Sequence, residues 1–297
     1  MAGSGGVGLL SAAIAPYPAA MDLDFSEDEI RRYSRHILLR EVGGTGQAKL
    51  KAARVLVVGA GGLGSPLVLY LAAAGIGTIG IVDDDLVELS NLQRQIAHTV
   101  ASIGTPKTAS AAAAAHAINP GVTIEAHATR LTAANAMDLV SRYDLVCDGT
   151  DNFSSRFLVA DACVLARRTL VSGAVLRFDG QLSVFRPHIG GPCYRCLYPE
   201  PPPPGLVPSC SEAGVLGAVT GVIGTLQATE VLKEIMGIGE TLAGRLLVWD
   251  ALATRFRTVK LPRDPDCALC GPQATIRDLS AHAASEAEGG AGQACGV

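Results

Sequence analysis

The feature that most constrains the fold of this chain is a glycine-rich loop that joins a hydrophobic segment to a helix. Arg54–Val58 (RVLVV) reads as a buried strand, and residues 59–64 (GAGGLG) match the G-x-G-x-x-G pattern and lead into a helix that ends near Gly75. A second hydrophobic segment, Thr78–Val82, ends at Asp83. This order of strand, glycine loop, helix, strand and acid is typical of the first unit of a nucleotide-binding α/β fold.

The following segments continue the alternation of helices and strands. We expect a helix after Pro106, strands at 122–126 and 144–147, a helix at 156–166 and a strand at 170–172. This order predicts the α/β class, with a Rossmann-like, mostly parallel sheet and helices on both of its faces. After Gly173 the pattern favours antiparallel strands at 181–185, 246–249 and 255–259. One long helix is predicted between them at 212–236, where three glycines would permit close packing.

The two ends of the chain differ in composition from the part between them. A helix with a capping box formed by Ser26 and Glu29 predicts that the folded domain begins at residue 26. Residues 1–25 are predicted to be a disordered leader, and residues 277–297, which are rich in Ala, Gly and Glu, a disordered tail. The folded domain is therefore expected at residues 26–276.

Charge and hydrophobicity exclude two classes of partner. The chain has 24 Lys and Arg against 28 Asp and Glu, a net charge of -4, and offers no basic stripe for nucleic acid. Its longest hydrophobic segment, residues 214–226, is shorter than the ~20 residues that span a bilayer. A secretory signal requires basic residues before its hydrophobic region, and none precedes the hydrophobic patch near the N-terminus. We therefore expect a cytoplasmic protein without direct nucleic-acid or membrane binding.

The glycine loop is the first candidate for ligand binding. Gly59, Gly61, Gly62 and Gly64 would let the backbone approach a phosphate, which the amides at the start of the following helix would stabilise. Asp83, 19 residues beyond Gly64, lies where an acid would receive ribose hydroxyls. This pattern alone is compatible with NAD, with ATP or with a tight turn that binds no ligand.

Charged residues beyond the second strand favour a triphosphate. Arg94 lies among amides in the segment SNLQRQ (90–95), and Lys107 begins the next predicted helix. Two cations would stabilise the charge that grows on pyrophosphate when the α-phosphate is attacked. Asp151, which follows the strand at 144–147, could hold a Mg²⁺ ion that bridges phosphate oxygens.

Two C-x-x-C pairs predict a metal site. Cys193, Cys196, Cys267 and Cys270 supply four thiolates, the set typical of structural Zn²⁺, and a full set of protein ligands leaves no open position for catalysis. A redox role is the alternative, but neither pair lies in the strand-to-helix context of thioredoxin-like proteins.

Cys210 is a candidate nucleophile, because it precedes the long predicted helix and a helix N-terminus lowers the pKa of a nearby thiol. An exposed loop cysteine without a role is nearly as consistent with its position. Cys147 and Cys163 fall in hydrophobic patterns and are predicted to be buried.

Taken together, these motifs resemble the MoeB/ThiF/HesA family, the bacterial relatives of ubiquitin-activating enzymes, over roughly residues 26–271. The segments CYRCLYPEPPPPG and CSEAGVLG especially resemble the adenylyltransferase part of eukaryotic molybdopterin-synthase sulfurases. The matching stretches are RYSRHILLR at 32–40, GAGGLG at 59–64, Asp83, SNLQRQ at 90–95, Pro106 with Lys107, GTDN at 149–152, CYRC at 193–196 and CALC at 267–270.

The resemblance implies an adenylation domain at 26–276 and a set of ligands for ATP. Arg35 would reach the triphosphate of the neighbouring subunit in a homodimer. The substrate would be the C-terminal Gly-Gly of a ubiquitin-fold sulfur-carrier protein, whose acyl-AMP a sulfur donor such as a cysteine desulfurase or a rhodanese later attacks. The residues implied to bind ATP are Gly62, Asp83, Asn91, Arg94, Gln95, Lys107, Asp151 and Asn152.

Three alternatives stay open at this point. The activated carrier could serve molybdopterin or thiamine biosynthesis, tRNA thiolation or cysteine synthesis. An NAD-dependent oxidoreductase would use the glycine loop and Asp83 but would leave Arg94, Lys107 and the cysteine pairs without a role. A non-catalytic zinc scaffold that binds a ubiquitin-fold partner would use only the cysteines.

Overall fold

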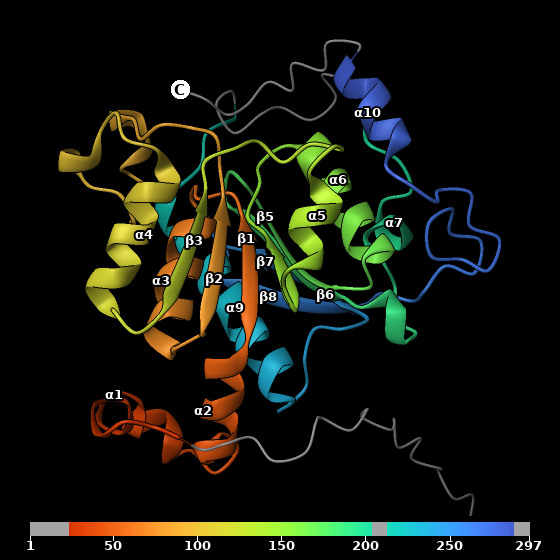
Figure 1. The fold of residues 1–297 in the computed structure, drawn as a ribbon. Coiled ribbons are helices and arrows are strands. Elements are labelled where there is room, and N and C mark those ends of the chain that lie inside the picture. The colour runs from red at the N-terminus through yellow and green to blue at the C-terminus, as the bar shows by residue number, and fades with distance from the viewer. Residues whose placement is uncertain (1–23, 204–212, 288–297) are drawn as a thin grey trace, which may run out of the picture.

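The computed structural model describes residues 24–203 and 213–287. Its central feature is an eight-stranded sheet with the strand order β3-β2-β1-β4-β5-β6-β7-β8 (Figure 1). The first five strands in this order are parallel, and β6, β7 and β8 are antiparallel to their neighbours, which confirms the predicted sheet. The strands are β1 (Arg54–Val58), β2 (Thr78–Val82), β3 (Thr123–His127), β4 (Leu145–Asp148), β5 (Thr169–Leu176), β6 (Asp179–Phe185), β7 (Arg245–Asp250) and β8 (Arg255–Lys260).

Helices cover both faces of the parallel part of the sheet (Figure 1). On one face α3 packs against both α4 and α9, and on the other α5 and α6 pack together. Side chains of β1 alternate between the two layers, since Val55 and Val57 join one hydrophobic core and Leu56 and Val58 the other. The helices are α1 (Glu27–Ile37), α2 (Gly43–Ala52), α3 (Gly64–Ala74), α4 (Lys107–Ile118), α5 (Ala136–Ser141), α6 (Phe153–Leu165), α7 (Tyr194–Leu197), α9 (Gly217–Met236) and α10 (Ser280–Ala287).

The helix predicted at 212–236 is shorter than expected. α9 begins at Gly217, because Gly214 has a φ of 75° and Val215 forms a bridge to Arg177. The predicted close packing occurs within the chain: a side chain at Gly217 would meet the carbonyl of Gln93, and one at Gly224 would meet the carbonyl of Leu63. The close packing at Gly217 and Gly224 is therefore explained by contacts within the chain.

The disordered tail predicted at 277–297 is wrong for part of its length. Ser280–Ala287 form α10, where the Nε2 of His282 lies 2.8 Å from Asp161 and Glu286 accepts a hydrogen bond from the amide of Ala133. The preceding Leu279 is buried in the core beside α6. The predicted leader lies outside the described residues as far as position 23, and α1 begins at Glu27 with the expected capping box.

Across the described ranges, none of the helices is long and hydrophobic enough to cross a membrane.

Candidate active site

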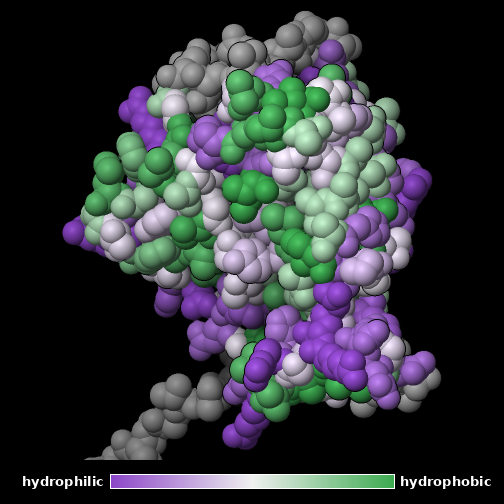
Figure 2. All heavy atoms as spheres, turned by 90° about the vertical axis from the view of Figure 1, so that its left-hand side faces the viewer, coloured by the Kyte–Doolittle hydropathy of each residue, from purple (hydrophilic) through white to green (hydrophobic). Residues whose placement is uncertain are grey.

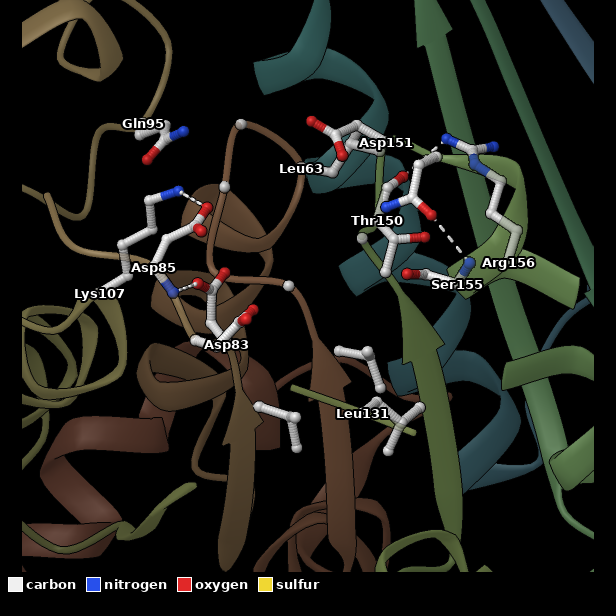
Figure 3. Close-up of a pocket in the computed structure, with 18 of the residues that line it drawn as sticks. Leu63, Asp83, Asp85, Gln95, Lys107, Leu131, Thr150, Asp151, Ser155 and Arg156 are labelled. Carbon is white, nitrogen blue, oxygen red and sulfur yellow. Dashed lines mark hydrogen bonds and ion pairs between the residues drawn. The ribbon is translucent and has the colours of Figure 1, made fainter. Parts of the chain in front are cut away.

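A cavity opens at the carboxyl ends of β1, β2 and β4 (Figure 3). From β1 the chain adds β2 and β3 on one side of the sheet and then β4 and β5 on the other, so the strand order changes direction between β1 and β4. In open α/β sheets this is the place where ligands bind. The cavity brings together nine of the residues predicted to bind nucleotide, which come from segments up to 93 positions apart. They are Gly59, Gly61, Gly62, Asp83, Arg94, Gln95, Lys107, Asp151 and Asn152.

The glycine loop forms the floor of the cavity and depends on two of its glycines for its shape. Gly59 has a φ of 94°, and a Cβ there would lie 2.9 Å from the carbonyl oxygen of Gly149. A Cβ at Gly64 would lie 1.9 Å from the carbonyl oxygen of Gly59, so Gly64 allows helix α3 to start directly above the strand. Gly64 therefore shapes the loop without lining the cavity.

Asp83, at the end of β2, holds the loop in place. Its carboxylate accepts hydrogen bonds from the amides of Ala60, at 2.8 Å, and Asp85, at 2.9 Å. Burial raises the pKa of Asp83, and the charge of Lys107 and these two amides oppose that effect. The carboxylate is thus positioned at the ribose side of a nucleotide that would lie across the glycine loop.

One wall of the cavity carries positive charge. Lys107, at the start of α4, is 5% exposed, and its Nζ lies 2.6 Å from Asp85 (Figure 3). Arg94 lines the same cavity and is held by a hydrogen bond to the carbonyl of Ser90. Gln95 is buried beside them, with no hydrogen-bond partner within the described residues for its Oε1. These groups match the needs of a triphosphate.

The opposite wall follows β4. Asp151 is exposed at the tip of the loop between β4 and α6, and Asn152 caps α6 by accepting a hydrogen bond from the amide of Ser155. The amide nitrogen of Asn152 stays available to donate to a ligand. The lining residues that sequence reasoning missed include Thr129, Arg130, Leu131, Thr150, Ser155 and Arg156.

Besides Gly64, two predicted nucleotide-site residues within the described ranges, Asn91 and Arg35, do not line this cavity. Asn91 is buried, and its Oδ1 accepts a hydrogen bond from the amide of Glu88 to cap a short turn. Arg35 is exposed on α1, which lies beyond the amino ends of the strands, whereas the cavity lies at their carboxyl ends (Figure 1). Cys210 lies outside the described residues.

His98 connects helix α4 to the glycine loop. Its Nε2 donates a hydrogen bond to the carbonyl of Ala60, and its Nδ1 accepts one from Ser110, both at 2.9 Å. Since a carbonyl only accepts, the proton resides on Nε2. Burial lowers the pKa of His98, the hydrogen bond to the carbonyl of Ala60 opposes this effect, and the charge of Lys107 adds to it. The ring is therefore neutral in the folded protein at pH 7.

The neutral state of His98 predicts a dependence of stability on pH. As pH falls below 6.5, the unfolded chain takes up a proton that the folded histidine resists, so wild-type stability should fall relative to that of His98→Gln. Above that pH, loss of the native hydrogen bonds should make the variant less stable by about 1 kcal/mol. Urea unfolding at several pH values measures both effects. A stability difference that stays constant with pH would contradict a neutral, buried ring.

A second cavity of about 470 Å³ adjoins the first and shares Asp151, Arg156 and Val175 with it. Gly173 on β5 and Gly180 on β6 face side chains of α9, so α9 covers one face of these strands. The second cavity lies on the other face of β5, β6 and β7. Its walls are mostly hydrophobic, formed by Ala174, Leu176, Phe185, Tyr194, Leu197, Tyr198, Leu246 and Val248.

The four cysteines predicted to bind metal form a cluster. All four Sγ atoms lie within 4.8 Å of one another, with separations of 3.5 Å for Cys193–Cys267 and for Cys196–Cys270 and of 3.8 Å for Cys193–Cys196. A zinc tetrahedron with 2.3 Å bonds has edges of about 3.8 Å. The hydrogen bond between the two thiols raises the pKa of Cys193 and lowers that of Cys196 to about 5. The cluster therefore fits a closed, structural zinc site.

Comparison with known proteins agrees with these features. A model of the ThiF family matches residues 33–269. Adenylyltransferase and sulfurtransferase MOCS3 of Bos taurus is 55% identical over 270 residues, which cover 91% of this chain and 59% of that protein. Sulfur carrier protein adenylyltransferase of Thermus thermophilus is 50% identical over 259 residues, which cover 86% of this chain and 96% of that protein. The chain thus spans about three fifths of the bovine relative and nearly all of the bacterial one.

Solved structures with a similar fold include E. coli MccB in complex with AMPCPP and MccA. The TM-score is 0.73 at 22% sequence identity, and the match covers 84% of this chain and 75% of that one. At this level of identity the similarity concerns the fold alone.

Proposed function

This chain belongs to the ThiF family, and from that premise we propose that it transfers AMP from ATP to the C-terminal carboxylate of a ubiquitin-fold sulfur-carrier protein ending in Gly-Gly. The observation that carries the proposal is the cavity in which Arg94, Lys107 and Asp151 surround the glycine loop. The carrier would serve molybdopterin or thiamine biosynthesis, or tRNA thiolation. The acyl-AMP would then be attacked by a sulfur donor such as a cysteine desulfurase or a rhodanese.

The chemistry requires positioning and charge stabilisation. The carrier's carboxylate is ionised at pH 7, so it can attack the α-phosphorus of ATP without a general base. A carboxylate oxygen–phosphorus bond forms, the bond to pyrophosphate breaks, and Arg94 and Lys107 stabilise the charge on the leaving group. Asp151 would hold Mg²⁺, which would supply charge neutralisation at the phosphate oxygens.

The second cavity supports the choice of substrate. It leads from the open face of β5, β6 and β7 to the nucleotide cavity, with which it shares Asp151 and Arg156. A carrier docked on this hydrophobic face could extend its last residues to the α-phosphate.

The four-cysteine cluster would hold one structural Zn²⁺ and fix the segment around Tyr194, which lines this cavity. Free, buried Cys147 and Cys163 fit a reducing compartment, and we place the protein in the cytoplasm.

Exchange of labelled pyrophosphate into ATP tests the proposal. Carriers from the three pathways should be supplied in turn, each with a control that lacks the last glycine. We expect exchange with an intact carrier and none without it. Absence of exchange with every carrier would contradict the function, and titration with NAD and with ATP–Mg would then test the oxidoreductase alternative.

A homodimer would complete the site. Leu86, Leu89, Ile96 and Val100 expose between 53% and 71% of their surface on the segment next to the cavity. Figure 2, which looks onto the side of α3 and α4, shows hydrophobic side chains gathered on this face. Leu38 and Leu39, which follow α1, are also exposed, and a second copy covering these surfaces could bring its Arg35 to the triphosphate.

Mixing two inactive variants tests the shared site. Arg35→Ala and Lys107→Ala should each be inactive alone. In an exchanged mixture half of the dimers combine both chains, and each has one intact site, so about a quarter of wild-type exchange should return. No recovery after verified subunit exchange would mean that each site is built from one chain.

A further inference from the structure

Arg156 lies where the two cavities meet. It belongs to the first turn of α6, lines both cavities and is only 8% exposed. Figure 3 shows its side chain extending along the wall formed by Thr150 and Asp151, across the cavity from Lys107. A cation buried at this boundary is well placed to act on whatever passes from one cavity to the other.

A hydrogen bond to the loop after β4 holds the guanidinium group in position. Its Nη2 donates a hydrogen bond of 2.7 Å to the carbonyl of Thr150, in the loop after β4. On the other side lies Tyr194, between two of the zinc-site cysteines. Burial raises the pKa of Tyr194 to about 12, and the charge of Arg156 and a hydrogen bond with it partly oppose this effect. The carbonyl of Thr150 therefore orients the guanidinium group, and Tyr194 is a secondary neighbour.

The charges around the second cavity explain why a cation is needed there. Of the described residues that line it, Asp151 and Asp179 are acidic and Arg156 alone is basic. A carboxylate that entered this cavity would be repelled by the acids and by the triphosphate. Lys107 cannot offset this repulsion, because it lies on the far wall and is paired with Asp85.

We propose that Arg156 binds the terminal carboxylate of the carrier and orients one of its oxygens toward the α-phosphorus, an inference that rests on the function proposed above. The planar guanidinium can form charge-assisted hydrogen bonds with a carboxylate. It keeps the nucleophile ionised and close to the phosphate, and it takes no part in proton transfer. Arg156 therefore distinguishes a free C-terminal carboxylate from a neutral chain end.

The test compares two forms of one carrier that ends in Gly-Gly, with a free carboxylate or a C-terminal carboxamide. Calorimetry with the full-length protein measures the binding of each form without ATP. Wild type should bind the carboxylate form about tenfold more tightly, and Arg156→Gln should bind both forms equally. ATP affinity should change less than about twofold, because the triphosphate cations are intact.

Tyr194→Phe is the matched control. It removes the hydrogen bond to Arg156 but keeps the charge, so tenfold discrimination should persist. Discrimination that survives in Arg156→Gln, or that is lost equally in Tyr194→Phe, would overturn the assignment of Arg156. Wild type that exchanges pyrophosphate with the carrier yet binds both forms equally would overturn this inference alone. Absence of exchange in wild type would instead contradict the proposed function.

Discussion

Replacing Arg94 by alanine is expected to lower carrier-dependent ATP–pyrophosphate exchange by about 100-fold or more. The Arg94 side chain lines the nucleotide cavity and is oriented by its hydrogen bond to the carbonyl of Ser90. A preorganised cation stabilises charge on the leaving pyrophosphate without reorganisation, so its removal raises the barrier for the adenylation step. Exchange rates at saturating ATP and carrier measure the effect on that step directly.

Two further variants separate the charge from its geometry. Arg94→Lys keeps the charge but loses the planar fork, and its activity should lie between those of wild type and Arg94→Ala. Arg142→Ala removes an exposed arginine at the end of α5 and should exchange at the wild-type rate. Full exchange by Arg94→Ala would refute the role of this residue in adenylation.

Much of the candidate site could be predicted because its residues occupy corresponding positions in successive α/β units. Asp83 follows β2, Lys107 begins α4 and Asp151 follows β4, and the carboxyl ends of parallel strands meet at one edge of the sheet. The glycine loop identifies the strand at the centre of that edge. Spacing along the chain was therefore enough to bring these groups into one predicted pocket.

Arg156 was missed because an arginine within an otherwise ordinary helix looks like a solvated charge. Its burial depends on Tyr194 and on other residues around the second cavity, most of which are distant from it in sequence. One local signal was present: Arg156 lies four residues after Asn152, so the two positions share a face at the start of α6.

The tail was mispredicted because composition does not reveal specific contacts. Residues 280–287 are rich in Ala and Ser, but the contact of His282 with Asp161 and the burial of Leu279 dock α10 against the domain. The start of α9 was misplaced for a similar reason, since the bridge between Val215 and Arg177 is a tertiary interaction.

Replacing Cys193 by alanine is expected to abolish zinc binding and to lower the free energy of unfolding by about 4 kcal/mol or more, a cost typical of losing a structural metal. Cys193 is fully buried, and the remaining thiolates would be left close together without a cation to balance their charge. For a domain of this size the melting temperature should fall by about 10 °C. Elemental analysis and thermal unfolding measure the two effects.

The matched control is Cys163→Ala, which removes an equally buried thiol on α6 that does not belong to the cluster. That variant should keep one zinc ion per chain and lose about 1–2 kcal/mol, the cost of a small cavity. ATP binding should survive in Cys193→Ala, because none of the four cysteines lines the nucleotide cavity, whereas exchange should fall since Tyr194 borders the path to it. Freshly purified wild type without zinc, or Cys193→Ala as stable as Cys163→Ala, would refute a structural metal at this cluster.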